Sequence, residues 1–394
     1  MKRDRYVFAD EMLAELHHIL SFWNEKTFDE KGGFFGEVNA NNMTIKEANR
    51  GSILNSRILW TYAAAYNYTR EKEYLLMADH AYTYLVEHFY DAKNGGVFWE
   101  VDCNGKPSNT RKQGYAQAFA IYGLSEYYRA TGNDVCLTLA QKIYHALERH
   151  LYDNELGGYI EAQDEVWEPL TDWRLSEKDL NTPKSMNTHL HILEAYTNLY
   201  RCWKDDGLRN RIVELIHIFK DKIIDSQRMH LQLFFENDWT LQSQIDSYGH
   251  DIETGWLLCE AVEVIGAEEL KAEIERIAIK LTDSTLAEGS AEDGSIYNEK
   301  KGSHLDTDKH WWPQAEALVG YTNAWQITKD KKYLDQAEKV WDYILSNVID
   351  KQNGEWHALI DQNGNINANE PKAGFWKCPY HNSRAMLEMV KRLQ

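Results

Sequence analysis

A short acidic, double-glycine and aromatic phrase occurs three times in this chain at a fixed period. It reads FDEKGGFFGEV, YDAKNGGVFWEV and YDNELGGYIEA, and its aspartates, Asp29, Asp91 and Asp153, are 62 residues apart both times. Weaker versions of the phrase begin at Ile224, Leu286 and Ile349. A period of this kind is typical of a fold that repeats one structural unit. The sequence therefore predicts six similar units.

Helical periodicity precedes and follows each copy of the phrase. The predicted helix pairs are 9–23 with 51–69, 74–89 with 112–131, 134–151 with 184–203, 209–222 with 250–265, 270–286 with 313–327, and 333–348 with 379–392. Links within a pair are long and glycine-containing, which predicts small β-hairpins, whereas links between pairs are short. This alternation predicts an all-α fold, an (α/α)6 barrel with the second helix of each pair inside and every long loop at one end. An open helical solenoid is the alternative.

Composition limits the domain organisation and the partners. The 394 residues contain only 6 prolines and no low-complexity linker, which favours one catalytic domain over residues 1–394. A net charge of -19 argues against nucleic acid and anionic membranes as partners. The start lacks the apolar core of a signal peptide and no long apolar run follows, so we expect a cytoplasmic protein. We also expect a monomer. The 14 Trp and 23 Tyr suit the apolar faces of sugar rings, which makes a carbohydrate a candidate ligand.

Polar and aromatic residues interrupt the apolar pattern near the start of the second helix of each pair. In the barrel these six starts converge on one cavity below the long loops. The candidate site residues are Arg57, Tyr115, Asn187, His191, His250, Glu253, Trp256, Trp312, Glu316, Trp376 and His381.

Spacing refines this set and argues against a metal. His250, Glu253 and Trp256 share one helical face, so Glu253 is expected to hold the imidazole of His250 and raise its basicity. His189 is about 200° from His191 around the helix and should point away from it. The five cysteines form no CxxC pair and no HExxH occurs, so neither a zinc site nor a disulfide framework is predicted. A structural ion pair for Arg57 and a core role for the tryptophans are the alternatives.

Five motifs in order carry a family resemblance: NSRILW, MNTHLHILEAY, GHDIETGW, HWWPQAEAL and FWKCPYHN. The chain resembles the N-acylglucosamine 2-epimerase superfamily and, through Trp376 five residues before His381, the cellobiose 2-epimerases within it. The resemblance implies an (α/α)6 barrel that uses no nucleotide and no essential metal, so no cofactor is expected. By motif, it implies that His250 and His381 are the acid/base pair and that Glu253 is the partner of His250. It also implies that the sugar is contacted by His191, Asn187, Arg57 and Tyr115 and stacked on by Trp312 and Trp376.

The chemistry implied by the resemblance is epimerisation at C2 of a reducing sugar. Two histidines remove and return the proton beside the C1 carbonyl of the opened sugar through an enediolate. The expected substrates are β-1,4-linked disaccharides such as cellobiose, lactose and mannobiose. Aldose–ketose isomerisation of mannose to fructose and epimerisation of N-acylglucosamine are the alternatives. From other classes, a glycoside hydrolase would use two carboxylates among Asp251, Glu253 and Glu316, and a sugar-binding protein would need no acid/base pair.

Overall fold

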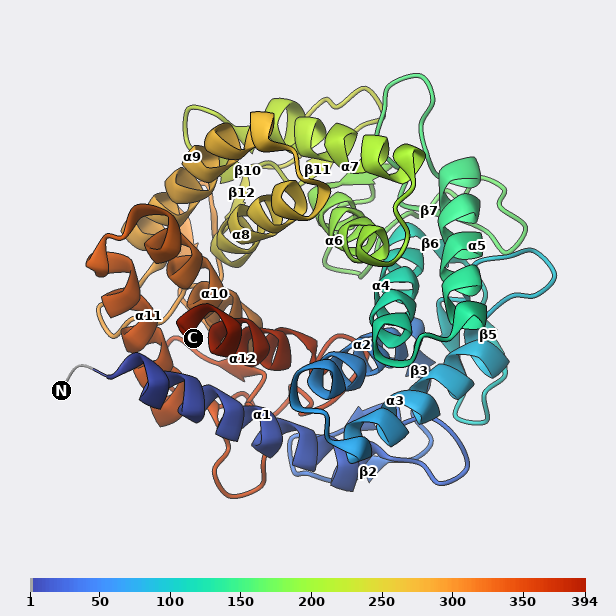
Figure 1. Cartoon of the computed structure of the whole chain (residues 1–394), viewed down its shortest axis with the longest axis horizontal. Helices are drawn as coiled ribbons and strands as arrows, with labels where there is room; N and C mark the ends of the chain where they lie inside the picture. The colour runs from blue at the N-terminus through green and yellow to red at the C-terminus, as the bar shows by residue number, and fades with distance from the viewer. Residues whose placement is uncertain (1–2) are drawn as a thin grey trace.

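Two concentric rings of helices make up most of the chain, and Figure 1 shows them end-on. The structure is a computed structural model that describes residues 3–394. The outer ring contains α1 (Arg5–Thr27), α3 (Lys72–Tyr84), α5 (Asp134–His150), α7 (Asp206–Ile218), α9 (Glu268–Ser284) and α11 (Lys331–Tyr343). The inner ring contains α2 (Ser52–Thr69), α4 (Gly114–Thr131), α6 (Met186–Cys202), α8 (Tyr248–Ile265), α10 (Trp311–Thr328) and α12 (Tyr380–Leu393).

Contacts between inner helices close the ring. Each inner helix packs against the next, and α12 packs against α2. Inner helices are buried around most of their surface, whereas an outer helix such as α5 buries one stripe containing Leu139, Ile143 and Leu147. A helix covered on one side needs only one apolar face. The predicted (α/α)6 barrel is confirmed, and the open solenoid is wrong.

Four outer helices end in a π-helical turn that the sequence did not predict. These turns are η1 (Leu85–Phe89), η2 (Phe219–Ile223), η3 (Thr285–Gly289) and η4 (Ile344–Val348). The apolar pattern continues through them, so the predicted helices 74–89, 209–222, 270–286 and 333–348 extend over both parts. The other predicted bounds differ from the observed ones by a few residues, as is usual for helix ends.

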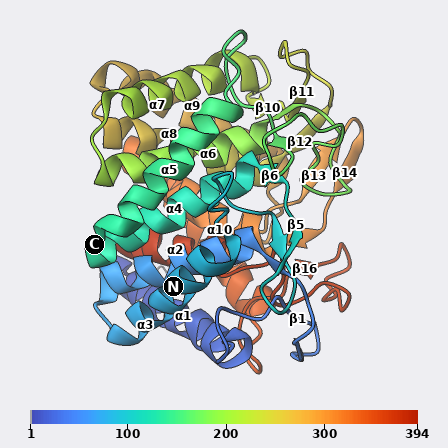
Figure 2. The same ribbon diagram turned by 90° about the vertical axis from the view of Figure 1, so that its right-hand side faces the viewer.

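Short strands gather at one end of the barrel, as the side view in Figure 2 shows. They are β1 (Glu37–Val38), β2 (Thr44–Ile45), β3 (Arg50–Gly51), β4 (Glu100–Val101), β5 (Pro107–Asn109), β6 (Lys112–Gln113), β7 (Ala162–Gln163), β8 (Lys184–Ser185), β9 (Ile224–Asp225), β10 (His230–Leu231), β11 (Phe234–Phe235), β12 (Ile245–Ser247), β13 (Glu299–Lys301), β14 (His304–Asp306), β15 (Lys309–His310) and β16 (Leu359–Ile360). The predicted hairpins within loops occur as β1–β2, β4–β5, β9–β10 and β13–β14.

Other strand pairs join neighbouring repeats. The strand that precedes an inner helix pairs with the long loop of the next hairpin, in the pairs β3–β4, β6–β7, β8–β11, β12–β13 and β15–β16. A bridge between Ala373 and Val38 joins the last hairpin to the first. We call this series of pairs the rim belt. The rim belt fixes the start of each inner helix against its neighbour.

The repeated phrase is the turn that carries this arrangement. Its aspartate caps its own turn, since Oδ1 of Asp91 accepts the backbone N–H groups of Lys93 and Asn94. The other carboxylate oxygen binds a buried cation just before the inner helix, as in Asp91 with Lys112 at 2.8 Å. The same ion pair joins Asp29 to Arg50, Asp153 to Lys184 and Asp350 to Lys372.

The second glycine of the phrase is needed at a tight contact. Gly96 has φ +73°, and a Cβ there would lie 2.7 Å from Oε1 of Gln117. That oxygen accepts the backbone N–H of Val97, and Nε2 of Gln117 donates to the Val97 carbonyl. The phrase therefore positions its loop directly on the inner helix that follows.

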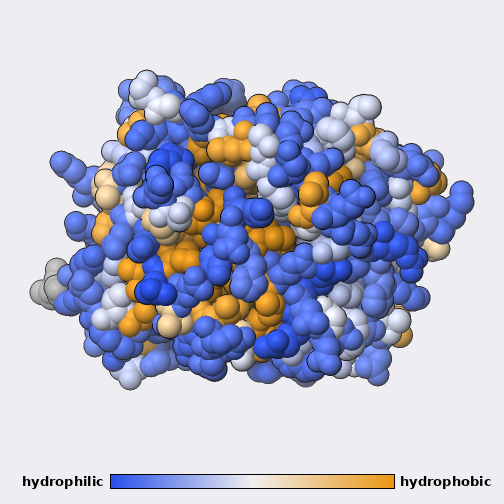
Figure 3. All heavy atoms as spheres, turned by 90° about the horizontal axis from the view of Figure 1, so that it is seen from above, coloured by the Kyte–Doolittle hydropathy of each residue, from blue (hydrophilic) through white to orange (hydrophobic). Residues whose placement is uncertain are grey.

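The outer surface is mainly polar. Figure 3 views the wall that lies at the top of Figure 1, where polar side chains surround an apolar area near the middle. Within the part of the chain that the structure describes, no helix is long and apolar enough to cross a membrane.

Candidate active site

Side chains from all six inner helices meet at the rim-belt end of the barrel. Most belong to the first two helical turns, so the helix starts bring them together. The indole of Trp312 lies between two imidazoles, with ring centroids 4.6 Å from His250 and 5.7 Å from His381. Two histidines far apart in the sequence thus flank one aromatic ring.

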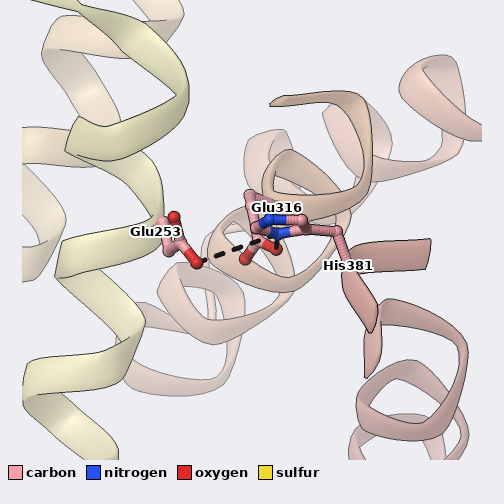
Figure 4. A group of neighbouring side chains, drawn as sticks. All are labelled: Glu253, Glu316 and His381. Carbon is pink, nitrogen blue, oxygen red and sulfur yellow. Dashed lines mark hydrogen bonds and ion pairs between the residues drawn. The ribbon is translucent and has the colours of Figure 1, made fainter. Parts of the chain in front are cut away.

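His381 is held by a carboxylate. Its Nδ1 lies 2.7 Å from Oε1 of Glu316 and 3.9 Å from Oε1 of Glu253, and Figure 4 shows both carboxylates directed at the imidazole. Burial, together with the charges of Arg57 and Arg384, holds the pKa of His381 well below its usual range. The ring is therefore neutral at pH 7. With Nδ1–H donated to Glu316, its Nε2 carries the free lone pair.

His250 is held by a hydroxyl group instead. Its Nδ1 lies 2.7 Å from Oγ of Ser247, the last residue of β12. Burial, together with the nearby His191, lowers the pKa of His250 to about 3. The predicted pairing of Glu253 with His250 is wrong, because Glu253 is turned to Arg384 at 2.5 Å. A guanidinium attracts the carboxylate more strongly than a neutral imidazole does.

His191 and Arg57 form a second group beside the first. Nδ1 of His191 lies 2.9 Å from Oε2 of Glu194, and burial lowers the pKa of His191 to about 4 despite that carboxylate. Arg57 donates to the hydroxyl of Tyr115 at 2.7 Å and its guanidinium lies 4.1 Å from the ring centre of Phe119. Its hydrogen bonds go to Tyr115 and Cys378, not to a carboxylate. The alternative of a structural ion pair is therefore wrong for Arg57.

Two further candidates lie at the edge of the site. The ring of Trp376 is 5.8 Å from that of Tyr115 and 6.0 Å from that of Trp99, and the side chain keeps part of its surface exposed. The Oδ1 atom of Asn187 is buried without a hydrogen-bond partner. Both residues have capacity to contact a ligand.

Trp256 and Glu316, two of the candidate site residues, are linked to His381 by hydrogen bonds. Both are buried, and Nε1–H of Trp256 donates to Oε2 of Glu316 at 3.1 Å. Trp256 is the ninth residue of α8 and Glu316 the sixth of α10, so both lie beyond the first helical turn. Through Glu316, both residues support His381.

His189 points away from the site, as predicted. Its Nδ1 lies 2.7 Å from the carbonyl oxygen of Ser185, and its Nε2 accepts the backbone N–H of Tyr159. It holds a rim loop to α6. Glu194 and Arg384 were not among the predicted site residues, although each follows a histidine of the site by three residues, the spacing at which helical side chains meet.

Comparison with known proteins places the chain. A family profile described as N-acylglucosamine 2-epimerase (GlcNAc 2-epimerase) matches residues 33–385. This chain belongs to that family. It is 46% identical over 388 residues to a cellobiose 2-epimerase of Bacteroides fragilis, covering 98% of this chain and 99% of that one. A cellobiose 2-epimerase of Dictyoglomus turgidum is 40% identical, covering 99% and 100%. A solved cellobiose 2-epimerase from Bacillus thermoamylovorans has a TM-score of 0.95 at 40% identity, covering 98% and 100%.

The carboxylates of this epimerase-family chain are not arranged for glycoside hydrolysis. Glu253 and Glu316 share one guanidinium, that of Arg384. Asp251 accepts from His230 and from the backbone N–H of Leu231. A hydrolase needs two carboxylates that face opposite sides of a glycosidic bond. The three acidic candidates are instead occupied by partners of their own chain.

Proposed function

We propose that this chain is a cellobiose 2-epimerase, which interconverts glucose and mannose at the reducing end of β-1,4-linked disaccharides. The observation that carries the proposal is the placement of two neutral histidines, His250 and His381, on either side of Trp312. Inversion at C2 requires proton transfer on opposite faces of one carbon, so two acid/base groups must flank it. The identity to cellobiose 2-epimerases over nearly the whole chain supports the same reaction.

The two histidines differ in the group that binds Nδ1, and this difference suits acid/base catalysis. Because Glu316 accepts Nδ1–H of His381, the Nε2 lone pair of His381 is directed to the substrate side and acts as a base. The hydroxyl of Ser247 can donate to Nδ1 of His250 or accept from it. His250 can therefore carry its proton on either nitrogen, and it serves as acid in one direction and as base in the other.

Arg57 stabilises the intermediate. Removing the C2 proton leaves an enediolate, whose oxygens carry developing negative charge. Arg57 is buried and permanently charged, and none of its hydrogen bonds goes to a carboxylate, so its charge is available to those oxygens. His191, neutral and held by Glu194, presents its other ring nitrogen as an acceptor for a sugar hydroxyl.

The disaccharide preference rests on the aromatic residues. Trp312 is placed to stack on the reducing-end sugar. Trp376 lies at the edge of the site toward the rim loops, where it can stack on the second sugar. Asn187 supplies an unpaired amide oxygen for a hydroxyl group. We infer that cellobiose, lactose and mannobiose are substrates, and that residues 1–394 act as one catalytic domain without a cofactor.

Incubation with cellobiose in D2O tests the proposal. The product should be a disaccharide with mannose at its reducing end and deuterium at C2, because an imidazole exchanges its proton with solvent. His250→Ala and His381→Ala should each lower the rate by about 10²–10⁴-fold. A ketose product would indicate an aldose–ketose isomerase, monosaccharides a hydrolase, and no change a binding protein. Turnover of N-acetylglucosamine in place of cellobiose would indicate an N-acylglucosamine 2-epimerase.

A further inference from the structure

A cavity of about 840 Å³ lies at the opposite end of the barrel from the rim belt. It is lined by the later turns of the inner helices, and its charged groups largely pair with one another, as in Arg201 with Glu260 at 2.7 Å. Glu194, Trp256 and Arg384 also line it. These three residues therefore separate this cavity from the histidines of the candidate active site.

Arg384 is the centre of the separating layer. Nη2 of Arg384 donates to Glu253 at 2.5 Å and to Glu316 at 2.7 Å, and Nη1 binds Glu194. Only 2% of Arg384 is exposed, and the three carboxylates are equally buried. Two of these carboxylates are themselves the partners of imidazoles, Glu316 of His381 and Glu194 of His191.

We propose that Arg384 is a positioning residue that orients His381 and His191 together, through Glu316 and Glu194, as the fixed cation of a buried network. The proposal rests on the proposed function and extends it. A single guanidinium offers several donors in one plane, so it holds carboxylates from different helices at fixed angles. Since each carboxylate in turn fixes the Nδ1–H of its imidazole, both histidines present Nε2 to the substrate in a set direction.

The same residues have the composition of a metal site, but the guanidinium of Arg384 already binds their carboxylates. Single ligand atoms of Glu253, Glu316 and His381 lie within 4.8 Å of one another, and all three residues are buried. A divalent cation would have to compete with the guanidinium that binds both carboxylates. The cation that binds the two carboxylates in this cluster is therefore the guanidinium of Arg384.

Arg384 also sets the charge around the site. Burial raises the pKa of Glu194, but Arg384, His191 and Tyr380 together outweigh burial and lower the pKa to about 2. Burial lowers the pKa values of His191 and His381 most, and the charges of Arg57 and Arg384 lower them further. The other groups facing these imidazoles are His250, Glu253 and Glu316. Loss of the Arg384 charge should therefore raise both histidine pKa values.

Three variants test the proposal on the full-length protein. In Arg384→Met, kcat for cellobiose should fall roughly tenfold to hundredfold with little change in KM, and the acid limb of the kcat profile should move to higher pH. Arg384→Lys keeps the charge and should leave the acid limb in place while lowering kcat. Arg384→Ala should regain activity with added guanidinium, which can reach the position through the cavity that Arg384 lines.

The matched control is Arg392→Met. Arg392 lies on the same helix, lines the same cavity and pairs with Glu388, but it touches none of the three network carboxylates. It should change neither kcat nor the acid limb. Loss of activity in Arg384→Met with an unmoved acid limb, or no rescue by guanidinium, would show a packing role and overturn the proposal.

A second readout is independent of turnover. Histidine side-chain NMR signals in wild type and in Arg384→Lys give the titration of each ring without a substrate. Arg384→Lys should keep His191 and His381 neutral at pH 7, while Arg384→Met raises both pKa values. If wild type does not epimerise cellobiose, the proposed function fails, and these titrations alone decide the role of Arg384. Unchanged titration in Arg384→Met would refute it.

Discussion

Replacement of Glu316 by glutamine should weaken the hydrogen bond that holds His381 while keeping the volume of the side chain at position 316. Oε1 of Glu316 accepts from Nδ1 of His381 and from Nη2 of Arg384, both at 2.7 Å, and Oε2 accepts from Trp256 at 3.1 Å. A carboxylate satisfies three donors at two oxygens. An amide has one oxygen and one NH2 group, so in either orientation at least one donor faces another donor.

The magnitude follows from the bonds that are lost. A hydrogen bond to a charged group contributes about 1.5–3 kcal/mol. If this energy serves to hold His381 with Nε2 unprotonated, kcat should fall roughly tenfold to 150-fold, at 1.36 kcal/mol per factor of ten. We expect KM to change little, because Glu316 is fully buried and its two oxygens bind His381, Arg384 and Trp256.

The assay is initial-rate epimerisation of cellobiose, with products separated by chromatography. Asp251→Asn is the matched control, because Asp251 holds His230 at 2.7 Å, outside the site, by the same type of contact. It should lower the melting temperature and leave kcat within about threefold of wild type. A kcat for Glu316→Gln within about threefold of wild type, or an equal loss in Asp251→Asn, would refute the positioning role of Glu316.

Three further predictions address the sugar, the pH and the helix ends. Trp312→Ala and Trp376→Ala should each lower kcat/KM for cellobiose more than that for mannose, by roughly fivefold to thirtyfold per lost stacking contact of about 1–2 kcal/mol; an unchanged ratio would mean that neither ring discriminates by sugar length. Because the folded-state pKa values of His250 and His191 are lowered to about 3 and about 4, the unfolded chain binds more protons than the folded one. Stability to urea should therefore fall as the pH falls from about 6.5 toward those values, and a flat profile would contradict burial of neutral rings. Lys329 caps α10 with φ +59°, so Lys329→Gly should stabilise the protein by up to about 1 kcal/mol, and a lower melting temperature would show that the lysine side chain is needed there.

Most of the fold could be predicted from the repeat in the sequence. A fixed period with alternating long and short links leaves few architectures, so the barrel and its inner helices followed from spacing alone. The strand pairs between repeats did not, because two-residue strands such as β6 and β7 have no periodicity to detect. The cation partners of the repeated aspartates were also missed, since the sequence alone does not indicate that Lys112 and Lys184 are buried.

The sequence predicted which residues form the candidate site better than it predicted which of them bind one another. Helical position places His250, Trp312 and His381 at one end, and the structure brings them together. Which carboxylate binds which histidine depends on contacts between helices, and these are invisible to spacing along one helix. Glu253 shares a face with His250, yet Arg384, 131 residues later, takes its carboxylate.

The rim belt determines which segments of this barrel can be exchanged as a unit. The strand before α8, which places His250, is paired with β13 of the following hairpin, and the strand before α10, which places Trp312, is paired with β16 of the next. A long loop is thus part of the support of the preceding inner helix. Chimeras with relatives should therefore be joined so that an inner helix travels with the loop one hairpin further along. Grafting a hairpin with only its own loop would separate a site residue from the strand that orients it.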